Sequence, residues 1–143
     1  MGNYSSKEQI EWERTRHSAL TSDVIWKLDA YRTALWFRHL AKPDCRAMRK
    51  LRPGEDLAEQ LGKSSGSIAS NIGEGYSRST RPDRLRFYGY ALGSTRECIT
   101  WYEDAREDFP SGHCDQRQDL LARLRALILG LISQMRPGTD FDP

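Results

Sequence analysis

Arginine is the residue type in this chain whose spacing best suits a binding site. Five arginines and one aspartate lie between Tyr76 and Arg96, whereas the next stretch, up to Phe109, holds five acidic residues and one arginine. Guanidinium groups three residues apart on a helix lie on one side of it and can bind phosphate oxygens through paired hydrogen bonds. The cluster predicts a polyanion-binding surface made by Arg78, Arg81, Arg84 and Arg86.

Basic residues elsewhere extend this predicted surface. They are Lys63 and four members of a basic stretch: Arg46, Arg49, Lys50 and Arg52. RNA or DNA would bind such a surface largely through phosphates, with an affinity that falls steeply as salt is added. A solvated surface, on which arginines pair with local carboxylates, explains the same residues equally well.

No residue pattern indicates catalysis or a bound cofactor. Gly62-Lys63-Ser64 resembles the end of a phosphate-binding loop, but Leu57 stands where that loop needs its first glycine. The three histidines lack the spacing of metal ligands, and the three cysteines form no Cys-x-x-Cys pair. We therefore expect a protein that is not an enzyme and that holds no metal and no cofactor.

Four stretches repeat hydrophobic residues at helical spacing. The first helix is expected from Ser22 to about Leu40, with Pro43 interrupting it and a basic connection over Lys42 to Pro53. The second follows Pro53-Gly54 and ends at Gly75. Thr80-x-x-Asp83 resembles a capping box that opens the third, which ends before Pro110. The fourth carries the regular stripe Leu124, Leu127, Ile128 and Leu131, which we expect in the core.

Four helices with short or moderate connections favour an all-α fold, an antiparallel up-down-up-down four-helix bundle. Residues 1–21 are expected to be a polar N-terminal extension with partial helix or disorder, residues 22–137 the bundle, and residues 138–143 a C-terminal tail. No apolar run is long enough to span a bilayer, and the N-terminus lacks a secretory signal, so we expect a cytoplasmic protein without a membrane partner.

The second helix contains an unusual density of small residues between Gly62 and Ser70. Because these residues form helices poorly, close packing of a neighbouring backbone explains them better than helix propensity does. Together with aromatic residues such as Trp26, Trp36 and Trp101, they favour a homo-oligomer.

Two motifs carry a family resemblance: Ser70-Asn71-Ile72-x-Glu74-Gly75 and Ala91-x-Gly93-Ser94-x-x-Glu97. With the residues around them, they resemble bacterial four-helix-bundle proteins that are often encoded by intervening sequences of 23S ribosomal RNA genes. That family is related to the accessory variability proteins of diversity-generating retroelements. The similarity covers about Ser22 to Arg136, and the chain departs from it at its polar N-terminal extension and at Gly73, where alanine is usual.

The resemblance implies a homo-oligomer, with a pentamer favoured, and a basic surface. The retroelement relatives are understood to bind a reverse transcriptase and RNA, whereas the intervening-sequence members have no established activity. Two functions follow: a scaffold that binds nucleic acid or a nucleic-acid enzyme such as reverse transcriptase, or a protein-only adaptor or structural oligomer. Glu74 is expected to pair with a nearby arginine such as Arg78. All the motif residues are expected to be structural, and they are Asn71, Glu74, Gly75, Gly93, Ser94 and Glu97.

Overall fold

The computed structural model describes residues 5–135, and its regular elements are helices, which confirms the all-α prediction. Two short helices, α1 (Lys7–Arg14) and α2 (Ser18–Thr21), and a 3-10 helix, η1 (Val24–Lys27), come first. The long helices follow: α3 (Asp29–Leu51), α4 (Leu57–Ser77), α5 (Arg81–Asp104) and α6 (His113–Gln134), with the 3-10 turn η2 (Arg106–Asp108) before α6.

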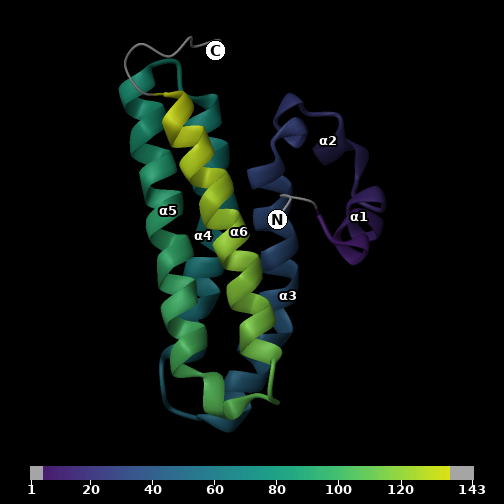
Figure 1. Ribbon diagram of the computed structural model, residues 1–143, viewed down its shortest axis with the longest axis vertical. Coiled ribbons are helices and arrows are strands. Elements are labelled where there is room, and N and C mark those ends of the chain that lie inside the picture. The colour runs from purple at the N-terminus through teal and green to yellow at the C-terminus, as the bar shows by residue number, and fades with distance from the viewer. Residues whose placement is uncertain (1–4, 136–143) are drawn as a thin grey trace.

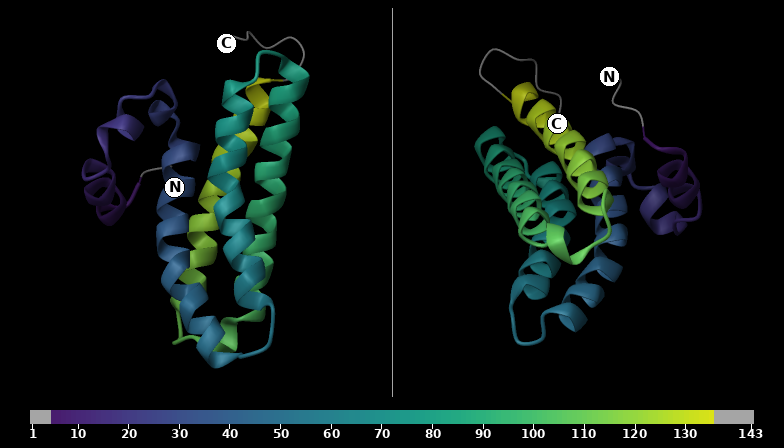
Figure 2. Two further views of the ribbon diagram at one scale, coloured as in Figure 1. Left: turned by 180° about the vertical axis from the view of Figure 1, so that it is seen from behind. Right: turned by 60° about the horizontal axis from the view of Figure 1, so that its bottom comes forward.

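The four long helices lie side by side, and the α1–α2 segment lies outside them against α3 (Figures 1 and 2). Closest packing joins α4 to α5, α3 to α4 and α5 to α6, whereas α3 and α6 touch less. The links 52–56 and 105–112 lie at one end of the long helices, and the link 78–80 lies at the other (Figure 1). Within residues 5–135, no helix is long and apolar enough to cross a membrane.

One hydrophobic core runs between the long helices. Phe37, Leu61, Ile68 and Tyr102 are fully buried in it. Leu124 and Ile128 are also fully buried, as expected, but Leu127 and Leu131 are only partly buried at the edge of the core. The core stripe of α6 is therefore narrower than its sequence spacing suggests.

Helix α3 differs most from its prediction, because it begins at Asp29 and runs through Pro43 to Leu51. The Asp23 side chain caps η1 instead of a helix starting at Ser22. Pro43 is exposed, so the carbonyl that loses its hydrogen bond lies on the solvent side of the helix. On the opposite side Ala41, Cys45 and Met48 are buried, and their packing offsets the cost of the proline.

Helix α4 continues past Gly75 to Ser77, so Gly75 does not end it. A Cβ at Gly75 would lie 2.7 Å from Cε1 of Tyr88, and glycine therefore lets α5 approach at this point. The predicted start of the next helix is confirmed: the Thr80 hydroxyl accepts a hydrogen bond from the Asp83 backbone N–H, and proline occupies the first turn.

Candidate nucleic-acid interface

The arginines around the link 78–80 gather on aromatic rings. The Arg78 guanidinium lies 4.7 Å from the centre of the Phe87 ring, and that of Arg86 lies 4.9 Å from the same centre. Both arginines also bind carboxylates, since Arg78 pairs with Glu74 at 2.7 Å and Arg86 with Asp83 at 3.3 Å. These ion pairs reduce the positive charge that this surface offers to an anion.

Two members of the predicted cluster are less open to a ligand. Arg84 is only 8% exposed, and its Nε donates a 2.7 Å hydrogen bond to the Arg78 carbonyl. Its guanidinium lies over the Tyr76 ring, so Arg84 holds the link between α4 and α5. Arg81, the first residue of α5, is half-buried. The Arg84 guanidinium is therefore mostly buried within the chain, and its part in a polyanion-binding surface stays a prediction.

A second basic surface lies on the C-terminal half of α3. Lys42, Arg46, Arg49 and Lys50 are all exposed, and their spacing places them on one side of the helix. Among residues 5–135, none of these four side chains has a carboxylate within ion-pair distance. Arg46, Arg49 and Lys50 line a shallow depression with Pro43 and Ala47. We call these four cationic residues the α3 basic face.

The remaining predicted residues form ion pairs. Arg52 contacts Glu55, Asp104 and Asp108 and so ties the link 52–56 to the end of α5. Lys63 pairs with Glu59 one turn earlier on α4 at 3.2 Å. The α3 basic face and the Arg78 to Arg86 cluster lie at opposite ends of helices about 30 Å long, so the predicted residues form two surfaces rather than one (Figure 1).

The family motifs build a polar contact between α4 and α5. The Ser64 hydroxyl donates to Glu97 at 2.8 Å, and the Ser67 hydroxyl donates to that of Ser94 at 2.7 Å. Asn71 donates its amide to the Ser67 carbonyl. The predicted pairing of Glu74 with Arg78 is confirmed.

Small residues of α4 also admit an arginine side chain from α3. A Cβ at Gly66 would lie 3.5 Å from Cζ of Arg38, which donates hydrogen bonds to the Gly62 carbonyl and the Ser65 hydroxyl. The close neighbour at Gly66 is thus a side chain of the same chain, and not the backbone that the sequence led us to expect.

Sequence reasoning missed a buried polar cluster around Asp44, which is 4% exposed. Its carboxylate accepts hydrogen bonds from the Tyr102 hydroxyl at 2.6 Å and from Nε of Arg117 at 2.8 Å, and it lies 2.8 Å from Nε2 of His113. The His113 ring stacks on Phe109. Burial, and then the Asp44 charge, raise the pKa of the Tyr102 hydroxyl, which therefore stays protonated as a donor.

The Asp44 cluster holds three long helices together. Asp44 lies on α3, Tyr102 on α5, and His113 and Arg117 on α6. Since three donor groups surround one carboxylate and its oxygens are satisfied, the arrangement suits a structural role better than catalysis. The only local feature of the sequence that could have drawn attention to Asp44 is the proline before it, Pro43.

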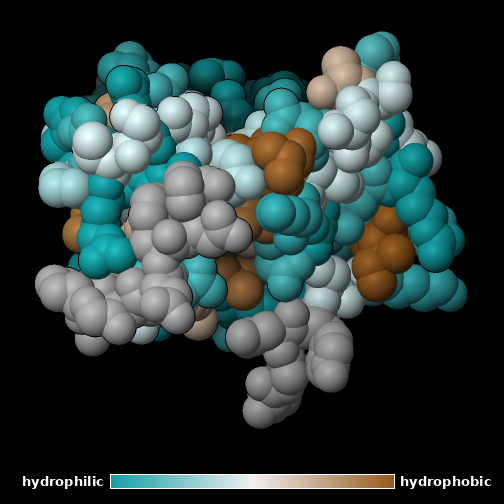
Figure 3. All heavy atoms as spheres, turned by 90° about the horizontal axis from the view of Figure 1, so that it is seen from above, coloured by the Kyte–Doolittle hydropathy of each residue, from teal (hydrophilic) through white to brown (hydrophobic). Residues whose placement is uncertain are grey.

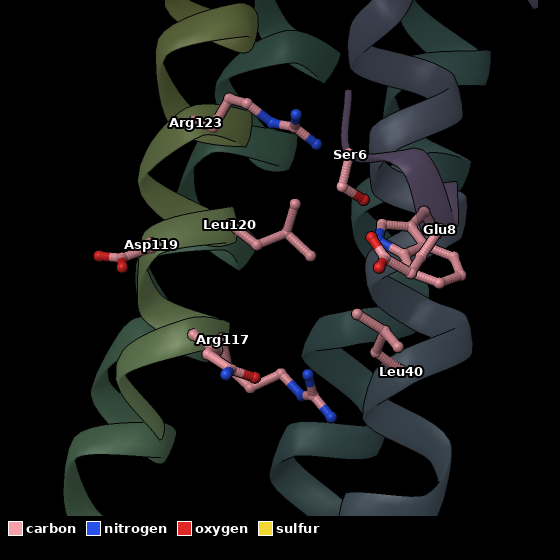
Figure 4. Close-up of a pocket in the computed structure, with 9 residues that line it drawn as sticks. Ser6, Glu8, Leu40, Arg117, Asp119, Leu120 and Arg123 are labelled. Carbon is pink, nitrogen blue, oxygen red and sulfur yellow. The ribbon is translucent and has the colours of Figure 1, made fainter. Parts of the chain in front are cut away.

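A cavity of about 630 Å³ opens between the N-terminal segment, α3 and α6 (Figure 4). Leu40 and Leu120 face each other across it, Arg117 and Arg123 point into it from α6, and Ser6 closes one side (Figure 4). Beside it, the buried Gln9 donates to the Thr33 hydroxyl at 3.2 Å and accepts from Arg123. Two cationic and two anionic residues line the cavity, and of these Asp119 points away from it (Figure 4).

One aromatic residue that was expected at an interface, Trp36, makes ring contacts within the chain. Trp36 packs against Trp12 and stacks on His39, which fixes α1 on α3. Burial, followed by the charges of Arg16 and Lys42, lowers the pKa of His39. The three cysteines are buried as free thiols, and burial raises the pKa of each. Within residues 5–135, no group of His, Cys, Asp or Glu side chains is arranged to hold a metal ion.

Comparison with known proteins identifies a family over residues 44–124. A family model described as 23S rRNA-intervening sequence protein matches residues 44–124, more than half of the chain. Among solved structures, a protein of unknown function from the S23 ribosomal protein family of Bacteroides thetaiotaomicron is similar, with a TM-score of 0.68. The match covers 72% of this chain and 97% of that chain at 18% identity, which establishes likeness of fold. No curated protein matches the chain.

Proposed function

Since the chain belongs to the family of 23S rRNA-intervening sequence proteins, we propose that it is a non-enzymatic, oligomeric scaffold that binds RNA or DNA. The scaffold is an up-down-up-down four-helix bundle with an N-terminal extension. It binds nucleic acid directly or beside a nucleic-acid enzyme such as a reverse transcriptase.

The α3 basic face carries this proposal. Its four cationic side chains are exposed and have no carboxylate partner among the described residues, whereas Arg78 and Arg86 at the other end are paired. A cation that already contacts a carboxylate must exchange that contact for a phosphate, but an unpaired cation only releases solvent and counterions. The solved relative's S23 ribosomal family name is consistent with a partner that contains RNA.

Charge reversal on the α3 basic face is expected to weaken nucleic-acid binding. The double variant Arg46→Glu with Arg49→Glu should bind a single-stranded RNA about tenfold or more weakly at low salt, because two phosphate contacts become repulsive. Fluorescence anisotropy of a labelled RNA measures this change. The matched control, Arg14→Glu with Lys27→Glu, alters the net charge equally at two exposed positions on other elements.

Three outcomes decide the charge-reversal experiment. A loss confined to the α3 variant supports the proposal. An equal loss in both variants means that only overall charge matters, which contradicts a defined face. If the wild-type protein binds no RNA or DNA at low salt, the nucleic-acid function is wrong and the protein-only oligomer replaces it.

An uncharged surface on α6 supports the proposed oligomer. Residues 126–134 carry no charged side chain, although Ala126, Leu129, Gly130 and Ser133 are exposed there. Depletion of charge is typical of the central part of a subunit interface. Light scattering should therefore give a mass several times 16.5 kDa, five times if the assembly is a pentamer.

The α6 surface can be tested by one substitution. Leu129 is 41% exposed, so Leu129→Glu should leave the fold of the single chain intact. Burial of the new charge against a second copy would be costly, and the mass should fall toward that of one chain. The control is Gln116→Glu, which adds the same charge at an exposed position of α6 outside residues 126–134. A wild-type mass near 16.5 kDa at micromolar concentration would contradict the oligomer.

A further inference from the structure

Helix α5 presents an exposed tyrosine that no intramolecular contact explains fully. Tyr90 is 52% exposed, and its ring meets Phe87 edge to face with the ring centres 5.8 Å apart. Phe87 in turn lies under the guanidiniums of Arg78 and Arg86. One side of Tyr90 is therefore supported by an aromatic and cationic cluster, and the rest of its ring faces solvent.

Two glycines keep the surroundings of Tyr90 open. Gly89 precedes it, and Gly93 lies three residues later on the same exposed side of α5. A Cβ at either glycine would meet nothing within 4 Å, so packing inside the chain does not require glycine at these positions. A glycine in a helix interior destabilises the helix relative to alanine, because it loses more backbone freedom on folding. Close approach of a flat ligand to the Tyr90 ring provides a reason for this cost.

Cations stand on one side of this open ring. Arg86 lies one turn before Tyr90 on α5, and Arg86 and Arg78 both lie over the Phe87 ring that Tyr90 contacts. An accessible aromatic ring beside guanidiniums is the arrangement that single-stranded nucleic acids need, because bases stack on the ring while phosphates contact the cations. Bases in a duplex are stacked on one another and do not offer a free face to a side chain.

From this geometry we infer that Tyr90, with Arg86 and Arg78, is a stacking site for an unpaired base of a single-stranded nucleic acid. The inference rests on the proposed nucleic-acid function and adds a substrate class to it. The α3 basic face contacts phosphates whether or not the bases are paired, whereas the Tyr90 site requires an unpaired base. The surface seen from the end where α4 passes into α5 is mostly hydrophilic with separate hydrophobic patches (Figure 3).

Three RNA probes separate base stacking from phosphate binding: a uridine oligonucleotide, an abasic strand of the same length, and a duplex. The wild-type protein should bind the uridine strand most tightly. Tyr90→Ala should weaken binding of the uridine strand about tenfold, the scale of one base stacked on an aromatic ring, and leave the other two probes unchanged. Tyr90→Phe keeps the ring and should bind like the wild-type protein. Gly93→Leu, which covers the ring, should act like Tyr90→Ala.

The possible failures are distinguishable. If the wild-type protein binds the intact and abasic strands equally, or if Tyr90→Ala changes nothing, the stacking site is wrong while the proposed function stands. If no probe binds, the proposed function fails and the stacking site with it. If Tyr90→Ala or Gly93→Leu lowers the mass in light scattering, this side of α5 contacts a second copy of the chain, and the inference is overturned.

Discussion

Replacing Asp44 with alanine is expected to lower the free energy of unfolding by about 3 to 5 kcal/mol, because the partly buried Arg117 and the buried Tyr102 lose their shared acceptor. The Asp44 carboxylate joins α3 to donors on α5 and α6, so its loss affects three helices at once. Urea denaturation followed by circular dichroism measures the change. Tyr102→Phe is the matched control: it removes one donor and should cost about 1 kcal/mol.

The stability of Asp44→Ala also shows whether the cluster around Asp44 has a structural role. A change in stability below about 1 kcal/mol for Asp44→Ala would mean that the cluster does not hold the helices together. In that case a binding role for the carboxylate and His113, whose side chain is 24% exposed, would need to be tested.

Replacing leucines of α6 with alanine should lower the stability of the protein by different amounts at different positions. Leu124 is fully buried, and Leu124→Ala should cost about 2 to 5 kcal/mol through lost burial and the cavity that remains. Leu131 is only partly buried, so Leu131→Ala should cost clearly less. Thermal denaturation of the two variants compares them directly.

Two other results are possible for the leucine variants, and each would change the account of α6. Unchanged thermal stability in Leu124→Ala would mean that α6 does not pack as the structure shows. An equal, large cost at Leu131 would mean that this position is buried in the assembled protein, which would place the proposed subunit interface over it.

Local signals predicted those parts of the fold that neighbouring residues determine. Thr80 and Asp83 are three residues apart, so the cap of α5 could be recognised from the sequence. Pro43 shows the limit of such reasoning. A proline normally ends a helix, but here residues distant in the chain bury the opposite side of α3, and that packing decides the outcome.

The candidate sites also contain some features that local sequence predicts and others that depend on contacts between distant residues. Basic residues were identified from composition, but their separation into two surfaces depends on the direction of α3 relative to α5. The partners of Asp44 lie 58, 69 and 73 residues away, so no spacing rule could associate them. The contact between Gly66 and Arg38 was likewise hidden, because Arg38 comes from another helix.

The most direct test of nucleic-acid binding is its dependence on salt. A single-stranded RNA is titrated with the wild-type protein at several salt concentrations, and the logarithm of the affinity is plotted against that of the salt concentration. Four phosphate contacts by the α3 basic face predict a slope of about −3, and the Arg46→Glu, Arg49→Glu variant should reduce its magnitude by about 1.4. Absence of binding at the lowest salt, or an affinity that does not change with salt, would contradict a phosphate-binding scaffold.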